Sequence, residues 1–330
     1  MVDAVLNENF AANNKAFAVR RFGPGERRFR AFTAAAALLV LLIFVGALVA
    51  LVRGAWPALH AFGLPFLWTQ TWNPVTEKFG ALAPICGTLI TAALAMIIAV
   101  PVGIGIAIFL TEICPRALKR PIGIAIELLA GIPSIIFGIW GLFVFAPFFQ
   151  QNVQPWLIDL FANVPVLQDL FAGPPYGIGM FTASLILSIM VLPFISAVTR
   201  DVFGTVPPQL KESAYSLGCT KWEVMWNVVL PFSRIGVVGG AMLALGRALG
   251  ETMAVTFVIG NAHRISESIF APGTTIAAAI ANEFTEAVGD LYLSSLIAIG
   301  LILFVITFIV LAFAQIMLYR LNRRAGGRSQ

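Results

Sequence analysis

The chain has 330 residues, of which 59% are hydrophobic and only 11% are charged, and its mean hydropathy is +0.91. A soluble domain has roughly 25% charged and 45–50% apolar residues, so this composition excludes an ordinary soluble protein and predicts several membrane crossings. The net charge of +5 does not indicate nucleic-acid binding, because the basic residues lie beside the apolar runs. Three cysteines at distant positions predict neither a disulfide framework nor a CxxC metal site.

Apolar runs divide the chain into six candidate transmembrane helices. A bilayer core about 30 Å thick needs about 20 apolar residues in a helix. Uninterrupted apolar runs also lack the alternation that a barrel strand requires. The sequence therefore predicts an all-α polytopic bundle over 31–320, between an N-terminal tail (1–30) and a C-terminal tail (321–330). The predicted spans are about 31–52, 84–111, 122–146, 177–199, 235–259 and 292–318.

Lysine and arginine are distributed unevenly between alternate loops. Seventeen of the 21 lie in the N-terminal tail, the second loop, the fourth loop (200–234) and the C-terminal tail. Cytoplasmic loops carry an excess of these residues, so both termini and the fourth loop are predicted to be cytoplasmic. A long polar and basic stretch precedes the first apolar run, so no cleavable signal peptide is predicted.

Two segments are expected on the outer face of the membrane. Residues 147–176 combine aromatic clusters with four prolines, which predicts short interfacial segments. Residues 274–287 predict an amphipathic helix whose acids, Glu283 and Glu286, are interpreted as solvated charges.

The chain lacks the sequence motifs of an ATP-hydrolysing enzyme or of a metal-dependent hydrolase. No GxxxxGK[ST] phosphate-binding loop occurs, and Gly103-Ile-Gly105 lies inside an apolar run rather than at a strand-to-helix turn. The two histidines, His60 and His263, lie outside the predicted spans, and HExxH is missing. We therefore expect no catalytic residue, cofactor or metal site in this chain.

The cytoplasmic loop between the fourth and fifth spans has the pattern of a helix-turn-helix. A proline pair suits a first helical turn and Gly218 suits the left-handed position after a helix end, which predicts a helix over about 208–217. Thr220 and Glu223 predict a capping box for a second helix that Pro231 ends. Both helices carry apolar stripes that can rest on the bundle or on the lipid interface: Leu210, Ala214 and Leu217, then Trp222, Met225, Trp226 and Val229.

The spacing within this loop resembles a known family pattern. Glu212-Ser-Ala214, then Gly218 after three residues and Val228-Val-Leu-Pro231 after nine more, resembles the EAA loop of ATP-binding-cassette importer permeases. Serine replaces one alanine and valine replaces isoleucine. In that family the loop forms a coupling helix that docks on a separate ATPase subunit. The resemblance therefore implies that Glu212, Ala214 and Gly218 lie at a docking surface and that ATP is hydrolysed by another chain.

The fifth span contains two charged residues. Arg247 lies near the middle of the predicted span, where a lone charge costs at least about 2.5 kcal/mol and should face a packed or wet interior. Glu251 is four residues further on and can pair with it, while Gly236 and Gly240 share the same helix face. The pair is interpreted either as a structural ion pair or as part of a path for an oxyanion, which a guanidinium group matches in geometry.

Three further residues interrupt the apolar character of the spans. Glu127, about one turn inside the third span, is interpreted as a residue that snorkels, bonds to a neighbour or takes part in transport. Pro101 and Pro133 are expected to break two spans, as gates or as ordinary kinks.

Longer phrases indicate a narrower family. Gly246-Arg-Ala-Leu-Gly-Glu-Thr-Met-Ala-Val255, Gly131-Ile-Pro-Ser-Ile-Ile-Phe-Gly138 and Phe79-Gly-Ala-Leu-Ala-Pro-Ile-Cys-Gly-Thr-Leu89 are similar to phosphate-importer permeases of the PstC type. The similarity runs over about residues 30–322. Sulfate and molybdate permeases carry a related RALGE phrase, typically followed by Phe-Gly, and are the alternative. A secondary transporter or channel that works alone has no need of the spaced EAA pattern.

This resemblance implies a type I ABC importer permease fold in the bacterial inner membrane, working by alternating access. It implies four partners: a second homologous permease subunit, an ATP-binding-cassette ATPase dimer, an external phosphate-binding protein and the phosphate ion itself. Arg247 and Glu251 would then lie in the translocation path.

Overall fold

The computed structural model describes residues 24–165 and 167–326. The predicted tails therefore lie partly outside the described residues, at 1–23 and 327–330. Regular structure in the described part is helical, apart from one isolated bridge between Asn73 and Lys78. Six of its helices are long and apolar enough to cross a membrane, which confirms the predicted all-α bundle. The chain divides into a first unit that ends at Ala50 and a second unit that begins at Leu51.

The first unit contains the apolar beginning of α2 (Pro24–Phe62). Nearly every residue between positions 31 and 50 is exposed, including large apolar side chains such as Leu42 and Ile43. A helix that is hydrophobic all round and uncovered suits a lipid environment, where it satisfies its own backbone hydrogen bonds.

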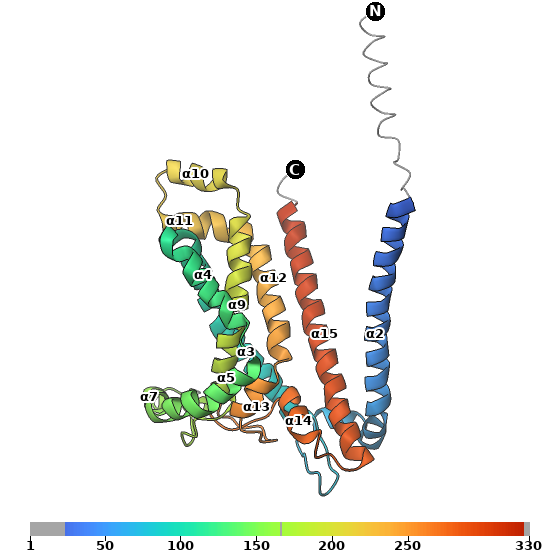
Figure 1. Cartoon of the computed structure of the whole chain (residues 1–330). Helices are drawn as coiled ribbons and strands as arrows, with labels where there is room; N and C mark the ends of the chain where they lie inside the picture. Colours follow the sequence, from blue (N-terminus) through green and yellow to red (C-terminus); the bar gives the residue numbers. More distant parts are fainter. Residues whose placement is uncertain (1–23, 166, 327–330) are drawn as a thin grey trace, which may run out of the picture. The chain divides into compact units, whose positions relative to one another are not determined.

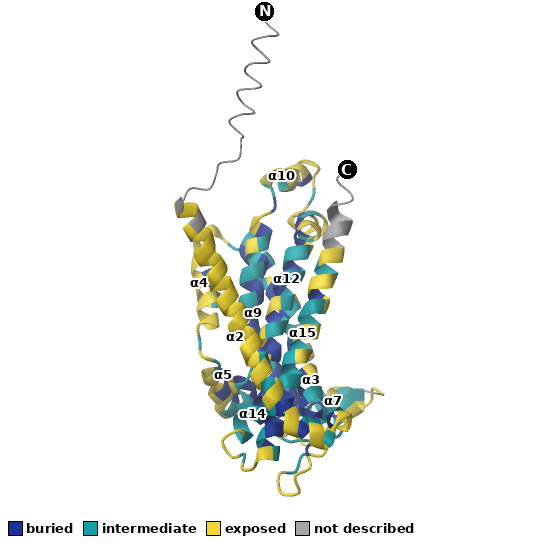
Figure 2. Cartoon of the chain, turned by 90° about the vertical axis from the view of Figure 1, so that its right-hand side faces the viewer, coloured by how far each residue is buried: buried dark blue, intermediate teal, exposed yellow. Residues whose placement is uncertain are grey.

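The centre of the second unit is a group of closely packed helices (Figure 1). The most extensive contact joins α3 (Leu82–Ile108) to α9 (Met180–Gly204). α12 (Leu230–Leu249) packs on both of them and also on α15 (Asp290–Gly326). Figure 2 shows buried residues along α9 and α12. Most residues of α4 (Arg116–Ala130) are exposed.

Small residues allow these helices to approach one another. A Cβ added at Gly103 of α3 would lie 2.7 Å from the side chain of Ile195 on α9. A Cβ at Gly240 of α12 would lie 2.7 Å from the side chain of Val198, also on α9. Close backbone approach at small residues is a usual way for helices to associate in membranes.

The two ends of the second unit differ in structure. At one end lie α10 (Pro208–Ser216), α11 (Lys221–Val224) and the C-terminal end of α15 (Figure 1). At the opposite end lie α5 (Ser134–Trp140), α7 (Gln154–Phe161), α13 (Met253–Val258) and α14 (Ile276–Glu283). α14 confirms the helix predicted within 274–287. The short elements between these helices are η1 (Leu64–Leu67), η2 (Phe109–Ile113), η3 (Gly141–Phe145), α6 (Ala146–Phe148), η4 (Phe149–Val153), α8 (Leu167–Leu170) and η5 (Met225–Val229).

The third span differs from the prediction of one helix over 122–146. α4 ends at Ala130 and α5 begins at Ser134, because Pro133 has no N–H to donate and disfavours helical backbone at the residue before it. The stretch long enough to cross a membrane runs instead over Ser134–Phe161, through three helical and two π-helical segments. Part of the predicted interfacial region therefore continues this span. By contrast, Pro101 lies inside α3 without ending it, so the predicted break there is wrong.

The fifth span differs from the prediction at both ends. It begins at Lys221 and continues through η5 into α12, so Pro231 does not end the second helix of the loop as predicted. The π turn of η5 lies directly before this proline, and its wider ring of hydrogen bonds accommodates the pyrrolidine and the missing donor. α12 then ends at Leu249 with Gly250 at its C-cap, and α13 is a separate short helix.

Candidate functional site

The loop between α9 and α12 folds as the predicted helix-turn-helix. After α10 the chain turns at Gly218, whose φ of +87° lies in the left-handed region that favours glycine. Thr220 Oγ1 accepts a hydrogen bond from the Glu223 backbone N–H at 3.3 Å. The Thr220 N–H in turn donates to Glu223 Oε2 at 2.7 Å. The capping box predicted from sequence is therefore confirmed.

The three residues assigned to a docking surface lie in different environments. Glu212 and Gly218 are exposed, and nothing lies within 4 Å of the position a Cβ would take at Gly218. Ala214 is only 8% exposed and packs in an apolar cluster with Val224 and Met225. Ala214 therefore packs α10 against the second helix. It does not lie on the exposed surface, where it was expected.

Large apolar side chains remain uncovered beside this turn. Leu217 is 85% exposed, and Trp222 and Trp226 are also exposed, with their ring centroids 5.5 Å apart in a stacked arrangement. Of the predicted stripe on the second helix, Met225 and Val229 are buried. An apolar patch at one end of a helix bundle indicates contact with a membrane or with another protein.

An ion pair fixes α10 to the end of α3. Lys211 Nζ lies 2.6 Å from Glu112 Oε1, and both side chains are largely buried. Lys221 Nζ donates to the backbone oxygen of Glu112 at 3.4 Å. Glu112 belongs to η2, which continues α3. The sequence analysis did not find this contact, because residues 99 positions apart carry no local signal of their pairing.

Arg247 lies in the last turn of α12 and not in the middle of its helix. It is exposed, and no ion pair within 4 Å joins it to Glu251 in the described part of the chain. The pairing expected from four-residue spacing is therefore wrong. Arg247 and Glu251 do not pair because the helix ends at Leu249 and Gly250 turns the chain. Glu251 is therefore not one turn further along the same helix.

Arg247 nevertheless lies close to a helix that is long and apolar enough to cross a membrane. The neighbouring Gly246 faces Leu311, since an added Cβ would lie 3.3 Å from that side chain. Leu311 belongs to the interior of the apolar span Asp290–Arg320 of α15. Among the described residues, Arg247 is thus an exposed cation without an ion pair, and they do not provide the helix-packed environment that was expected for it.

Glu127, whose role the sequence left open, bonds to a neighbour. Its Oε1 lies 2.6 Å from Nη2 of Arg200 on α9. The Arg200 guanidinium also lies 3.4 Å from Asp201. This pair joins α4 to α9 near the end of the unit that carries α10.

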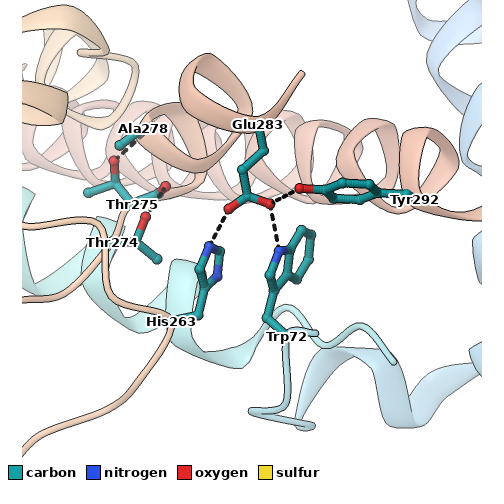
Figure 3. Close-up of polar contacts among 7 residues, drawn as sticks. All are labelled: Trp72, His263, Thr274, Thr275, Ala278, Glu283 and Tyr292. Carbon is teal, nitrogen blue, oxygen red and sulfur yellow. Dashed lines mark hydrogen bonds and ion pairs between the residues drawn. The ribbon is translucent and has the colours of Figure 1, made fainter. Parts of the chain in front are cut away.

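A second polar cluster lies at the opposite end, around Glu283 of α14 (Figure 3). Trp72 Nε1 and Tyr292 Oη donate to its Oε2 at 2.7 and 2.6 Å, and His263 Nε2 lies 2.5 Å from its Oε1. The His263 ring stacks on Trp72 with centroids 4.9 Å apart. Glu283 is therefore not a solvated charge, in contrast to Glu286, which is exposed.

Hydrogen bonding determines the charge state of this carboxyl. Burial alone would raise the pKa of Glu283, but the hydrogen bonds from His263, Tyr292 and Trp72 outweigh burial and hold that pKa below its ordinary value. An ionised carboxylate can only accept, so His263 Nε2 carries the proton in this contact. The carboxylate ties together three segments that are distant in sequence: the loop after α2, the loop before α14 and the start of α15.

Comparison with known proteins identifies the family. Residues 99–324 match the model for binding-protein-dependent transport system inner membrane components. The chain belongs to this family. The phosphate transport system permease protein PstC of Mesorhizobium japonicum is 67% identical over 308 residues, which covers 93% of this chain and 94% of that protein. PstC of Pasteurella multocida is 58% identical and covers 91% and 94%, and the probable PstC of Methanocaldococcus jannaschii is 38% identical and covers 86% and 90%.

Solved structures confirm the fold. A chain of a bacterial alginate ABC transporter, in complex with a periplasmic protein bound to an alginate pentasaccharide, matches with a TM-score of 0.60 at 20% identity, covering 88% of this chain and 96% of that chain. A chain of the inward-facing MetNI methionine ABC transporter matches with a TM-score of 0.50 at 16% identity, covering 78% and 98%. The chain therefore has the type I ABC importer permease fold that the sequence resemblance implied.

Proposed function

We propose that this chain is the permease subunit of an ATP-driven importer of inorganic phosphate in the bacterial inner membrane. The observation that carries the proposal is 67% identity to a named phosphate transport permease over nearly the whole length of both chains. Sulfate and molybdate are not favoured as substrates, because the relatives described above are named for phosphate. In the proposed orientation both chain ends and α10 face the cytoplasm, as the lysine and arginine distribution predicts.

An ATPase dimer is proposed to dock on α10 and to supply the energy, so that this chain hydrolyses no ATP itself. The exposed Glu212 and the turn at Gly218 form the docking surface, and Ala214 supports it from beneath. The exposure of Glu212 and Gly218 at one end of the bundle, and the uncovered Leu217 beside them, support this assignment. The ion pair between Lys211 and Glu112 would transmit a displacement of α10 to α3.

The translocation path is proposed to include Arg247. An exposed cation at membrane depth would cost at least about 2.5 kcal/mol if it faced lipid, so a wet path shared with a second homologous permease subunit is the better environment. Its guanidinium offers paired N–H donors that match phosphate oxygens. Glu251 is half-buried just after the break in the helix, and we propose that its carboxylate also lines this path.

The outer end of the chain is proposed to receive an external phosphate-binding protein near α14. Closure of the ATPase dimer would draw the two coupling surfaces together and open the path outward, and ATP hydrolysis would reset it. This is alternating access by rigid movement of helix groups, which the packed centre of α3, α9 and α12 can sustain.

The experiment that tests the proposed function is ATP-dependent uptake into proteoliposomes that contain this chain, its second permease, the ATPase and the binding protein. Labelled phosphate, sulfate and molybdate are compared. Phosphate uptake that requires both ATP and the ATPase is the expected result. A preference for sulfate or molybdate would refute the substrate, and uptake by this chain alone would refute the coupling.

A further inference from the structure

A basic groove with a volume of about 370 Å³ lies between α4 and α9. It has no role in the docking surface or the path proposed above. Its lining includes four cationic residues, one acidic residue and one glycine: Arg116, Lys119, Arg120, Arg200, Glu127 and Gly123.

Helical geometry gathers five of these residues on one face of α4. Positions 116, 119, 120, 123 and 127 follow the three- and four-residue spacing that places side chains above one another. Arg200 faces them from α9. The groove is therefore built by two helices that already pack on each other, and it does not depend on a mobile loop.

Charge within the groove is not balanced. Glu127 is engaged with Arg200 at 2.6 Å. Arg116, Lys119 and Arg120 form no ion pair within 4 Å in the described part of the chain. Three like charges within about one helical turn repel one another, so the groove is complementary to an anion.

Gly123 keeps the groove open. It is buried, and an added Cβ would lie 3.2 Å from Nη1 of Arg200. A larger side chain would push the guanidinium away or occupy the space between the helices. Arg200 is in turn held by Glu127, so that one guanidinium edge is fixed and the cations around Gly123 face the same space.

The surroundings of the groove are apolar and uncovered. Ile124 lines the groove and is exposed, and Leu128 lies exposed one turn further along α4. The basic end of α4 begins four residues after Glu112, the partner of Lys211 on α10, so the groove lies at the end of the bundle proposed to face the cytoplasm. An occupant must therefore combine an anionic group with an apolar part, at the edge of the membrane.

We propose that this groove binds the phosphate headgroup of an anionic phospholipid from the cytoplasmic leaflet, with the acyl chains along Ile124 and Leu128. Basic pockets between helices on this side of a membrane suit such headgroups, and arginine forms paired hydrogen bonds with phosphate oxygens. Bound lipid would neutralise the cations of α4 and fasten this helix, which is exposed along most of its length, to α9.

Native mass spectrometry of the full chain in detergent tests the proposal. Phosphatidylglycerol and phosphatidylcholine are titrated separately, and retained lipid is counted. The double substitution Lys119→Gln and Arg120→Gln should weaken retention of phosphatidylglycerol about 30-fold. The matched control, Arg234→Gln with Arg320→Gln, removes two exposed cations outside the groove and should change retention less than about threefold. Phosphatidylcholine should bind weakly to every variant.

A second variant and two competitors keep the proposal open to refutation. Gly123→Leu keeps every charge but fills the groove, so it should also lose phosphatidylglycerol while the chain stays monodisperse. Retention unchanged in both groove variants would overturn the proposal. Displacement of the lipid by millimolar inorganic phosphate as readily as by short-chain phosphatidylglycerol would also overturn it, in favour of a soluble anion. The same groove variants are also measured in the complex assembled with the second permease and the ATPase. Loss of either partner there, with lipid retention intact, would overturn the proposal and mark the groove as a protein interface instead.

Discussion

Replacement of Glu283 by alanine offers a direct measurement of what the outer cluster contributes to stability. The substitution removes the acceptor for Trp72, Tyr292 and His263 at once. It leaves three donors near a site that is largely closed to water. The three segments that meet there would then lose the hydrogen bonds that join them through this carboxylate.

The expected magnitude follows from the geometry. A hydrogen bond to a charged group contributes about 1.5–3 kcal/mol, and three such bonds would exceed 4 kcal/mol if they were independent. The Glu283 side chain is 18% exposed, so water replaces part of the lost bonding. Contributions within one network are also not additive. We therefore expect the free energy of unfolding to fall by about 3–5 kcal/mol.

The assay is unfolding of the purified chain in mixed micelles, titrated with a denaturing detergent and followed by tryptophan fluorescence. Glu286→Ala is the matched control, because Glu286 is exposed three residues away, and its effect should stay below about 0.5 kcal/mol. Glu283→Gln keeps one acceptor oxygen for Trp72 and Tyr292 but loses the charge, so it should cost about 1–2 kcal/mol. If Glu283→Ala and Glu286→Ala destabilise the chain equally, the reasoning about this cluster is wrong.

The remaining predictions concern pH, coupling and transport. Because the pKa of Glu283 is lowered on folding, its stabilisation is present above the ordinary pKa of a glutamate and is lost as the pH falls through the lower folded value. Unfolding midpoints measured from pH 7 to pH 3 should therefore fall more steeply for the wild type than for Glu283→Gln, and parallel curves would refute this. Gly218→Trp should strain the left-handed turn by about 1–2 kcal/mol and leave the protein inserted but without associated ATPase in a pull-down, whereas normal stoichiometry would contradict the docking assignment. Arg247→Ala should lower phosphate uptake by the assembled complex at least about tenfold and Arg247→Lys should retain part of it, because lysine keeps the charge but not the paired donors; unchanged uptake for alanine would exclude a role in the path. Lys211→Met should leave ATPase binding intact but reduce the phosphate transported per ATP hydrolysed, since the contact with Glu112 is lost, and an unchanged ratio would show that α10 and α3 are coupled by other contacts.

Local patterns were enough to predict the loop between α9 and α12. Two prolines lie at the start of the first helix, and Gly218 has a positive φ just after its end. Thr220 and Glu223 form the capping box of the second helix. Each of these features involves residues that are close in sequence. The transmembrane character is similarly local, because about 20 consecutive apolar residues suffice to predict a span. These features depend on neighbours in sequence, so composition and spacing contain them.

Breaks in the helices were predicted less well, because one residue type has different effects in different surroundings. Pro133 follows Gly131, which ends α4, and the chain breaks there. Pro101 lies inside a helix packed on its neighbours, and Pro231 follows a π turn, so neither ends its helix. The helix also ends after Leu249, so Arg247 and Glu251 do not lie one turn apart on one helix, which their expected pairing required.

The sequence by itself determined that this chain is a bundle of membrane-spanning helices with a capped helix-turn-helix at one end. Its longer sequence motifs also predicted the family. Only the tertiary structure decided which charges meet. Glu112 with Lys211, Glu127 with Arg200 and Glu283 with its three donors all join residues from different helices or loops. Such pairs depend on how helices pack in three dimensions, and a buried charge is stable only where that packing brings it a partner. The same packing buried Ala214 and left Arg247 exposed, which spacing along the chain could not reveal.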